Sequence, residues 1–231
     1  MNKESLRDVC YTINLLNPNI RHTKEQLQDL YANTAKIHDY TYSVIRENGT
    51  AEFRITDQRT SETTKYVFTS NSILLVHEFI NKISLDHFAK SASDIVSNAI
   101  QYLNIPIFVE QRYVVRCHAN PLNLSDARKF ITEKVCSIKE SELNPYGRIV
   151  HGIGLRFFFP PTSNEPNEFD VKIESLLRDP RCLYLECMAR FFQPLQKDSL
   201  DLMRTNLLST KEFIYSNISD FLNQFNEKES E

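Results

Sequence analysis

The chain has 231 residues, of which 41% are apolar and 25% charged, so neither a disordered nor a fibrous protein is expected. This length suits one large domain or two small ones, and either can fold without cross-links. The formal net charge of −3 gives the whole molecule no attraction for polyanions such as nucleic acids, although a local basic patch could still bind them.

The cellular location is predicted from apolar runs and cysteines. Eighteen consecutive apolar residues occur nowhere, and the charged residues of 1–5 precede no long apolar segment. Neither a membrane span nor secretion is therefore indicated. The five cysteines are scattered without a CxxC pair, which is typical of reduced thiols in a core. Together these features predict a cytoplasmic protein.

Two segments of the chain open in a similar way, with an extended run that leads into Asn-Pro. The first covers 11–18 and the second covers 113–121. Proline disfavours helix at the residue before it, and a hydroxyl residue, Thr23 or Ser125, then stands where a helix N-cap is required. Thr23 and Gln26 also complete a capping box.

The same succession of helix, strands and helix follows each opening. Apolar residues spaced by three and four predict first helices over 24–37 and 126–138, and long closing helices over 84–103 and 199–225. Strands are predicted between them, over 40–46, 51–57, 64–69 and 73–79, then over 148–159, 168–176 and 182–192. Asn48-Gly49 favours a hairpin, because both residues tolerate positive φ.

The predicted fold class is α+β, with two similar β-α-β(3-4)-α halves whose antiparallel sheets pack on long helices. Proline at 106 ends a helix before a new strand. This gives a first half over 1–105, a second half over 106–226 and a flexible tail over 227–231. We interpret the likeness of the halves as an internal duplication, and the alternative is a chance similarity of two α+β halves.

The order of these elements resembles helix-grip and TATA-binding-protein-like folds, in which a curved antiparallel sheet wraps long helices. The motifs Gly154-Leu155-Arg156-Phe157 and Leu177-Arg178-Asp179-Pro180, with the final long helix, make the second half similar to a sporadically distributed family of uncharacterised bacterial proteins. The likeness of topology implies a fold and carries no function. The bacterial family supplies no established activity.

Strand parity locates the candidate site in the second half. Odd-numbered residues of its strands, from Val109 to Phe191, are mostly apolar and are predicted to face the helices, whereas even-numbered residues carry charges of both signs. Gly152 and Gly154 are predicted to leave room on the charged face for a ligand or a partner backbone. Arginine suits forked contacts with carboxylate or phosphate. The candidate ligand- or partner-binding residues are Arg112, Arg116, Arg148, Arg156, Glu186 and Arg190.

A second interpretation of these charges is favoured over a binding site. Charges on a solvated sheet face commonly form cross-strand ion pairs, each contributing about 0.2–1 kcal/mol. No catalytic, metal or cofactor site is predicted either. The four glycines form neither GxGxxG nor GxxxxGK, no HExxH or GxSxG is present, and His77 and His151 are interpreted as core or edge residues.

The leading hypothesis for function is a non-enzymatic protein-interaction module, which self-associates or joins a complex through its exposed charged sheet face. The alternative is a helix-grip-like binder, or enzyme, of an anionic small molecule held by Arg116, Arg156 or Arg190 in a cavity of about 300 Å³. A third hypothesis, nucleic acid on the sheet, is opposed by the interleaved acids and the negative net charge. The sequence leaves enzymatic activity open, and the lack of common catalytic motifs argues against it.

Overall fold

The computed structural model describes residues 5–80, 83–120 and 125–225, so the predicted tail over 227–231 and the second Asn-Pro proline, Pro121, lie outside the described residues. The first half of the chain forms β1 (Leu6–Leu16), α1 (Lys24–Thr34), β2 (Tyr42–Ile45), β3 (Ala51–Thr56), β4 (Thr63–Phe68), β5 (Ser72–Glu78) and α2 (Leu85–Tyr102). The second half forms β6 (Glu110–Ala119), α3 (Ala127–Lys129), the π-helix η3 (Phe130–Val135), the 3-10 helix η4 (Glu140–Tyr146), β7 (Gly154–Phe159), β8 (Glu168–Ser175), β9 (Leu183–Phe191), the 3-10 helix η5 (Lys197–Ser199), α4 (Asp201–Glu212), the π-helix η6 (Phe213–Ile218) and α5 (Ser219–Asn223).

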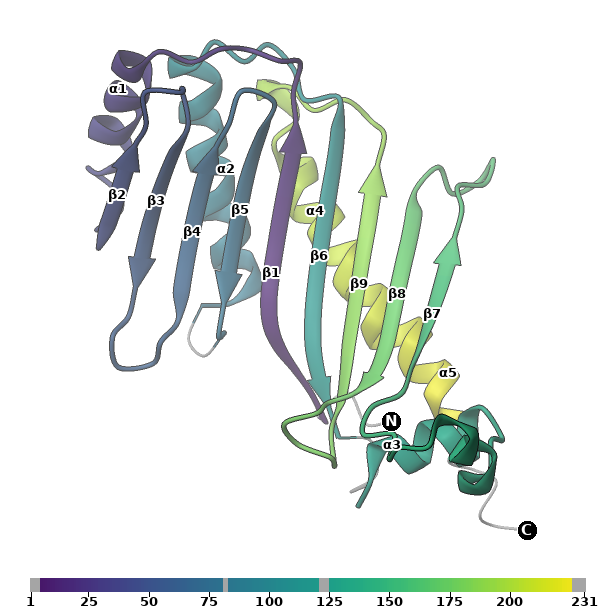
Figure 1. The fold of residues 1–231 in the computed structure, drawn as a ribbon. Coiled ribbons are helices and arrows are strands. Elements are labelled where there is room, and N and C mark those ends of the chain that lie inside the picture. Colours follow the sequence, from purple (N-terminus) through teal and green to yellow (C-terminus); the bar gives the residue numbers. More distant parts are fainter. Residues whose placement is uncertain (1–4, 81–82, 121–124, 226–231) are drawn as a thin grey trace.

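These strands make one antiparallel sheet of nine, in the order β2-β3-β4-β5-β1-β6-β9-β8-β7 (Figure 1). The first strands of the two halves, β1 and β6, pair at its centre. Outward from β1 lie β5, β4 and β3, and outward from β6 lie β9, β8 and β7. The predicted α+β class, with antiparallel strands packed on long helices, is confirmed, but the two halves share one sheet because β1 pairs with β6.

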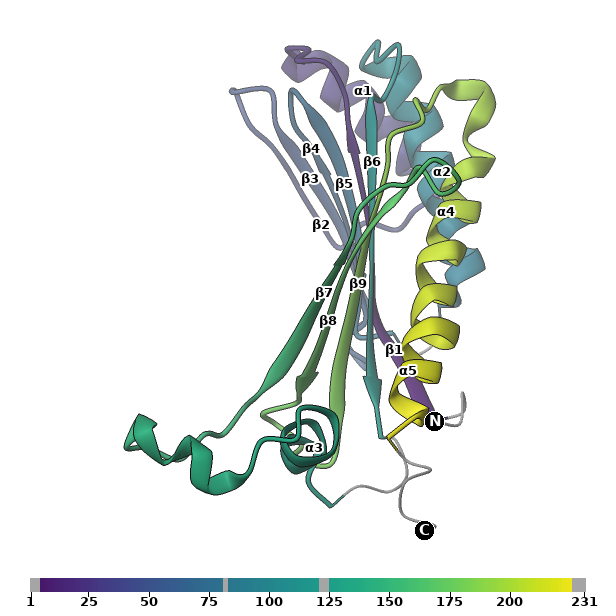
Figure 2. The ribbon, with the colours of Figure 1, turned by 90° about the vertical axis from the view of Figure 1, so that its right-hand side faces the viewer.

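All the long helices lie on one face of the sheet (Figure 2). Helix α1 packs against α2, and α2 packs against α4, which continues through η6 into α5. The hydrophobic core fills the space between this helix layer and the sheet, where Ile13, Phe53, Tyr113, Leu185 and Leu207 are fully buried. In the part of the chain that the structure describes, no helix covers the opposite face, which we call the open face.

Two local signals are confirmed. The Thr23 hydroxyl accepts a hydrogen bond from the Gln26 backbone N–H at 3.2 Å, and the Gln26 side chain accepts one from the Thr23 N–H at 2.9 Å, which completes the capping box of α1. Gly49 has a φ of +79° in the turn between β2 and β3. The predicted hairpin forms there because glycine adopts positive φ without a steric penalty.

The ends of the two short helices differ from the prediction. Helix α1 stops at Thr34, and Ile37, expected on its apolar stripe, is exposed. Asp126, not Ser125, caps α3 by accepting the Lys129 N–H at 3.0 Å. The α3–η3 helix ends at residue 135, earlier than expected, and the positive φ of residue 137 prevents its continuation.

The strand predicted over 148–159 begins only at Gly154, because its neighbouring strand β8 ends at Ser175. Gly154 lies opposite Glu174 near the end of β8. Ser175 is the last residue of β8, and its N–H bonds to the Ile153 carbonyl at 3.0 Å; the next N–H, of Leu176, bonds to the Cys182 carbonyl at 2.9 Å in the turn that joins β8 to β9. Residues 148–153 therefore form a loop, in which Ile149 is 75% exposed.

Candidate functional site

Four neighbouring strands bring the predicted site residues together on the open face. In the register of β6, β9 and β8, Arg116 lies opposite Glu186, and Glu186 lies opposite Lys172. Two rows further along the same face, Arg112 lies opposite Arg190 and Arg190 opposite Glu168. Strand alternation thus sets five of the six predicted residues side by side, as expected from parity.

Glu186 is the centre of one group of charges. Its carboxylate accepts hydrogen bonds from Arg116 Nε at 2.6 Å, from Lys172 Nζ at 2.6 Å and from the Tyr184 hydroxyl at 2.8 Å. Burial by itself would raise the pKa of Glu186, but these donors outweigh it and lower the pKa to about 2. The carboxylate is therefore a fixed negative charge and is unsuited to general acid–base chemistry at neutral pH.

Arg190 connects a second group. Its Nε donates to Glu110 at 3.1 Å and its Nη1 donates to Glu168 at 3.0 Å, while Arg112 Nε donates to Glu110 at 2.5 Å. Burial would raise the pKa of Glu110, but the hydrogen bonds from Arg190 and Arg112 lower it. The Arg190 guanidinium also lies 5.3 Å from the centre of the Phe192 ring, which is a cation–π contact.

Arg156 and Asp170 form a forked ion pair. Arg156 Nε and Nη2 donate to the two Asp170 oxygens at 2.8 and 2.5 Å, and these hydrogen bonds lower the pKa of Asp170. The aspartate side chain is only 7% exposed, whereas the arginine is 67% exposed. The acid lies beneath and the cation faces solvent.

The same layering holds across the open face. Glu110, Glu168, Asp170 and Glu186 are largely buried, and the arginines and lysine that cover them are the accessible charges. A guanidinium carries five N–H donors, so each arginine retains donors after binding its own acid. Exposed Phe158 and Phe192 lie among these charges. The favoured prediction of cross-strand ion pairs is confirmed.

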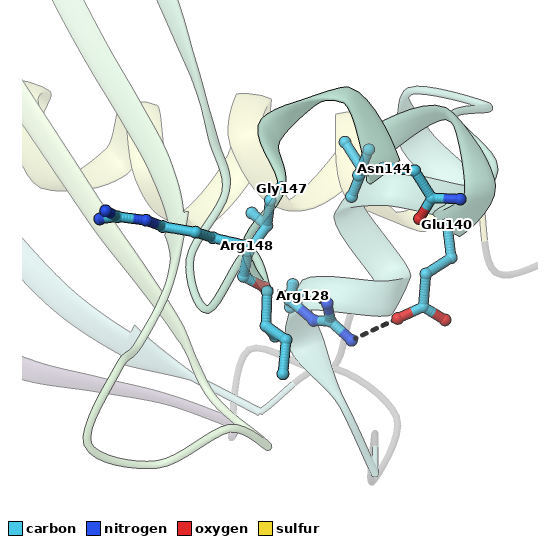
Figure 3. A pocket seen from close by; sticks show the side chains of 8 residues that line it. Arg128, Glu140, Asn144, Gly147 and Arg148 are labelled. Carbon is cyan, nitrogen blue, oxygen red and sulfur yellow. Dashed lines mark hydrogen bonds and ion pairs between the residues drawn. The ribbon is translucent and has the colours of Figure 1, made fainter.

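Two predictions about this site are wrong. Arg148 is not on the sheet, because its segment is the loop before β7; it lines a pocket of about 320 Å³ with Arg128, and in Figure 3 its guanidinium points away from the Arg128–Glu140 ion pair. The predicted room at the glycines is filled. A Cβ on Gly154 would lie 2.6 Å from Glu174 Cγ, and one on Gly152 would lie 2.9 Å from Leu177 Cδ2.

Comparison with solved structures gives several matches. The chain is similar to a solved structure of Methanococcus jannaschii TBP, a TATA-binding protein. The TM-score is 0.36 at 9% identity, over 90% of this chain and 99% of that one. No family model and no curated protein matches the chain, so the resemblance to the bacterial family stays a prediction.

Among the described residues, no three His, Cys, Asp or Glu side chains are grouped so as to hold a metal ion. None of the described helices is long and apolar enough to cross a membrane. His77 is fully buried between Thr64 and Glu62, at 2.9 and 3.0 Å from their side-chain oxygens, as expected of a core histidine, whereas His151 lies exposed in the loop before β7.

The sequence analysis did not predict one polar cluster, which centres on Asp8. Asp8 accepts hydrogen bonds from Lys211 Nζ at 2.6 Å and from the Tyr215 hydroxyl at 2.9 Å, and it also bonds to Tyr11 and Cys117. A β-bulge between residues 8 and 10 turns Asp8 toward the helices. The signal was a break in alternation, because the buried residues of β1 change from position 6 to positions 11, 13 and 15.

Proposed function

We propose that this protein is a non-enzymatic interaction module, which joins a complex by binding a protein partner with its open face. The observation that carries the proposal is the layering of charge there, with buried acids that fix exposed guanidinium groups on a rigid sheet. Pre-ordered donors lose little entropy on binding. The matching partner surface supplies carboxylates to these donors and apolar groups to Phe158 and Phe192.

The ion pairing makes the other ligand classes weaker candidates. Nucleic-acid affinity depends on cations that replace the counterions of phosphates, and here each of Arg116, Arg156 and Arg190 already has a carboxylate partner in the chain. An anionic small molecule would have to compete with the same carboxylates. A protein surface compensates for this competition, because it also makes apolar contacts with the exposed Phe158 and Phe192, which a small anion does not.

The proposal also includes an internal duplication and a cytoplasmic location. We propose that the two halves derive from one duplicated unit, which would account for the matching strand orders outward from β1 and β6. A cytoplasmic location is consistent with five cysteines that are all free thiols.

A charge reversal on the open face tests the proposal. Arg112→Glu removes the Arg112–Glu110 pair, but Arg190 lies opposite the new carboxylate and still donates to Glu110, so the fold is expected to tolerate the change. Arg204→Glu is the matched control, because Arg204 lies on the helix side in an exposed ion pair with Asp86 at 2.8 Å. Tagged forms of the three proteins are cross-linked in their native cells, and the captured proteins are quantified by mass spectrometry.

The expected result is a partner held by the wild-type protein and by Arg204→Glu, and held about tenfold less by Arg112→Glu, since loss of a complementary charge costs on the order of 1.4 kcal/mol. Equal capture by both variants, or no partner on the wild-type protein, would exclude the open face as the binding surface.

A further inference from the structure

Strand β7 ends the sheet on the side of the second half (Figure 1). The Ile153 carbonyl accepts the Ser175 N–H at 3.0 Å, so odd-numbered residues direct their backbone groups toward β8. The backbone N–H and C=O groups of Gly154, Arg156 and Phe158 consequently point outward from the edge. These are the groups that another strand would bind.

Apart from the exposed Arg156, this edge has few of the features that usually prevent strand pairing. Between Gly154 and Phe159 there is neither lysine nor proline, and three of the six residues are phenylalanine. Phe158 on the open face is 58% exposed, and Phe159 on the helix face is 42% exposed. The other edge strand, β2, has only four residues and packs against α1. An edge of six mainly apolar residues that pairs with no further strand of the described chain favours association.

An apolar groove continues from this edge on the helix side. Phe157 packs against Phe221, and Phe159 against Phe213, each with ring centres 5.3 Å apart. The groove has a volume of about 340 Å³ and is lined by Phe157, Phe159, Val171, Ile173, Phe213, Asn217, Ile218 and Phe221. A strand added to β7 would bring its own apolar side chains to the mouth of this groove.

We propose that β7 pairs antiparallel with β7 of a second copy of this chain, with the two-fold axis at Phe157. In this register Phe157 lies opposite its own counterpart, and Leu155 lies opposite Phe159 of the second copy, so the helix face becomes one apolar layer. Arg156 lies opposite Phe158 of the second copy on the open face, where the guanidinium contacts an aromatic ring. The outward backbone groups of Arg156 and Phe158 bond to each other across the axis.

The strand's own sequence favours a second copy as the occupant. Its one charged residue, Arg156, never meets itself in this register, whereas a register with Arg156 on the axis would oppose two like charges. Pro160 and Pro161 lack N–H groups and end the pairing after Phe159. A two-fold contact of this kind closes on itself and gives a dimer.

Two substitutions at Phe158 test this register. Phe158→Lys places a cation opposite Arg156 of the second copy and is expected to raise the dimer Kd about tenfold or more, whereas Phe158→Glu places a carboxylate there and is expected to keep the dimer. Residue 158 lies opposite Asp170 of its own chain, whose two oxygens both accept from Arg156, so both variants are expected to fold, which far-UV circular dichroism checks. Analytical ultracentrifugation of the purified chain measures a species of twice the 27.0 kDa chain mass.

Cysteine cross-linking supplies a second measurement. Phe157→Cys is expected to form a disulfide between copies on mild oxidation, because residues on the axis have Cα atoms about 4.5–5.5 Å apart. Phe159→Cys is the control and is expected to form none, since its counterpart lies four residues away along the paired strands. Peptide mapping identifies the linked cysteines.

A monomeric wild-type protein, equal effects of the two Phe158 substitutions, or equal cross-linking at 157 and 159 would overturn the proposal. The test is independent of the proposed function, because it uses the purified chain without a partner. If the purified chain is monomeric but Arg112→Glu still loses the captured partner, only the dimer proposal is overturned. If the chain is dimeric but no captured partner depends on Arg112, only the open-face function is overturned.

Discussion

Asp8 shows how single residues in this protein are held by several donors at once. Tyr11, Lys211 and Tyr215 come from β1, α4 and η6 in that order, and they converge on one carboxylate whose side chain is 11% exposed. Burial by itself would raise the pKa of Asp8, but the hydrogen bonds from Lys211 and Tyr11 outweigh it, so the pKa is lowered. The cluster joins the start of the sheet to the final helix.

Removing this charge is expected to destabilise the protein. Asp8→Asn leaves the Lys211 ammonium partly buried without its partner, which costs about 3 kcal/mol in the free energy of unfolding at neutral pH. The lowered pKa in the folded state means that the stabilisation is present above about pH 4 and is lost as the pH falls further. Urea unfolding at pH 7 and pH 3 measures this, and the gap between wild type and Asp8→Asn is expected to narrow at pH 3.

The control for this measurement is Asp179→Asn. The Asp179 carboxyl also has a lowered pKa, of about 2, through hydrogen bonds from Arg181, but the pair lies at the surface. Its stability is expected to stay close to that of the wild-type protein. A loss at Asp179 as large as that at Asp8 would show that burial is not the cause.

At the scale of elements, the β2–β3 hairpin depends on one backbone position. Gly49 has positive φ, and a Cβ built there would lie 2.6 Å from the His22 carbonyl oxygen just before α1. The hairpin turn therefore also fits closely against the start of the first helix. Sequence indicated the turn through Asn48-Gly49, but the contact with residue 22 depends on the packing of the two elements.

Gly49→Ala is expected to lower the free energy of unfolding by about 2 kcal/mol or more, because backbone strain and the clash with His22 both act. Gly147→Ala is the matched control. Its φ is also positive, at +64°, but nothing lies within 4 Å of the added Cβ, so strain alone costs about 1 kcal/mol. Chemical denaturation of both variants measures the difference, and equal losses would contradict a role for the clash.

The whole molecule is tied together by its central strands. β1 and β6 pair along most of their length, and one cluster of buried apolar residues extends through both halves. Because neither half has a core separate from the other, a change that loosens one half removes packing from both.

Thermal unfolding is therefore expected to occur in a single transition. Differential scanning calorimetry measures this through the ratio of the calorimetric to the van't Hoff enthalpy, which is expected to be close to one. Two resolved transitions would instead support independent domains over 1–105 and 106–226. A truncated chain is not needed, since the full-length protein distinguishes the two outcomes.

Local chemistry in the sequence determined the element types, the helix-facing and open faces of the second-half strands, the α1 capping box and the β2–β3 turn. These features depend on residues within about four positions of one another, where periodicity and cap or turn preferences act directly. Alternation of side chains along the strands also correctly predicted that one face of the sheet, the open face, carries Arg112, Arg116, Arg156, Glu186 and Arg190.

Only the tertiary structure decided which of these residues are buried, which are exposed and which strand lies at the edge of the sheet. Arg148 left the sheet because β8 ends before a partner for its segment is available, and Asp8 turned inward because of a bulge that one strand alone does not fix. Likewise, the acids of the open face are buried because arginines from neighbouring strands cover them, and β7 is an edge because no other strand of the described chain lies beyond it. Such outcomes depend on contacts between residues far apart in sequence, which local patterns do not encode.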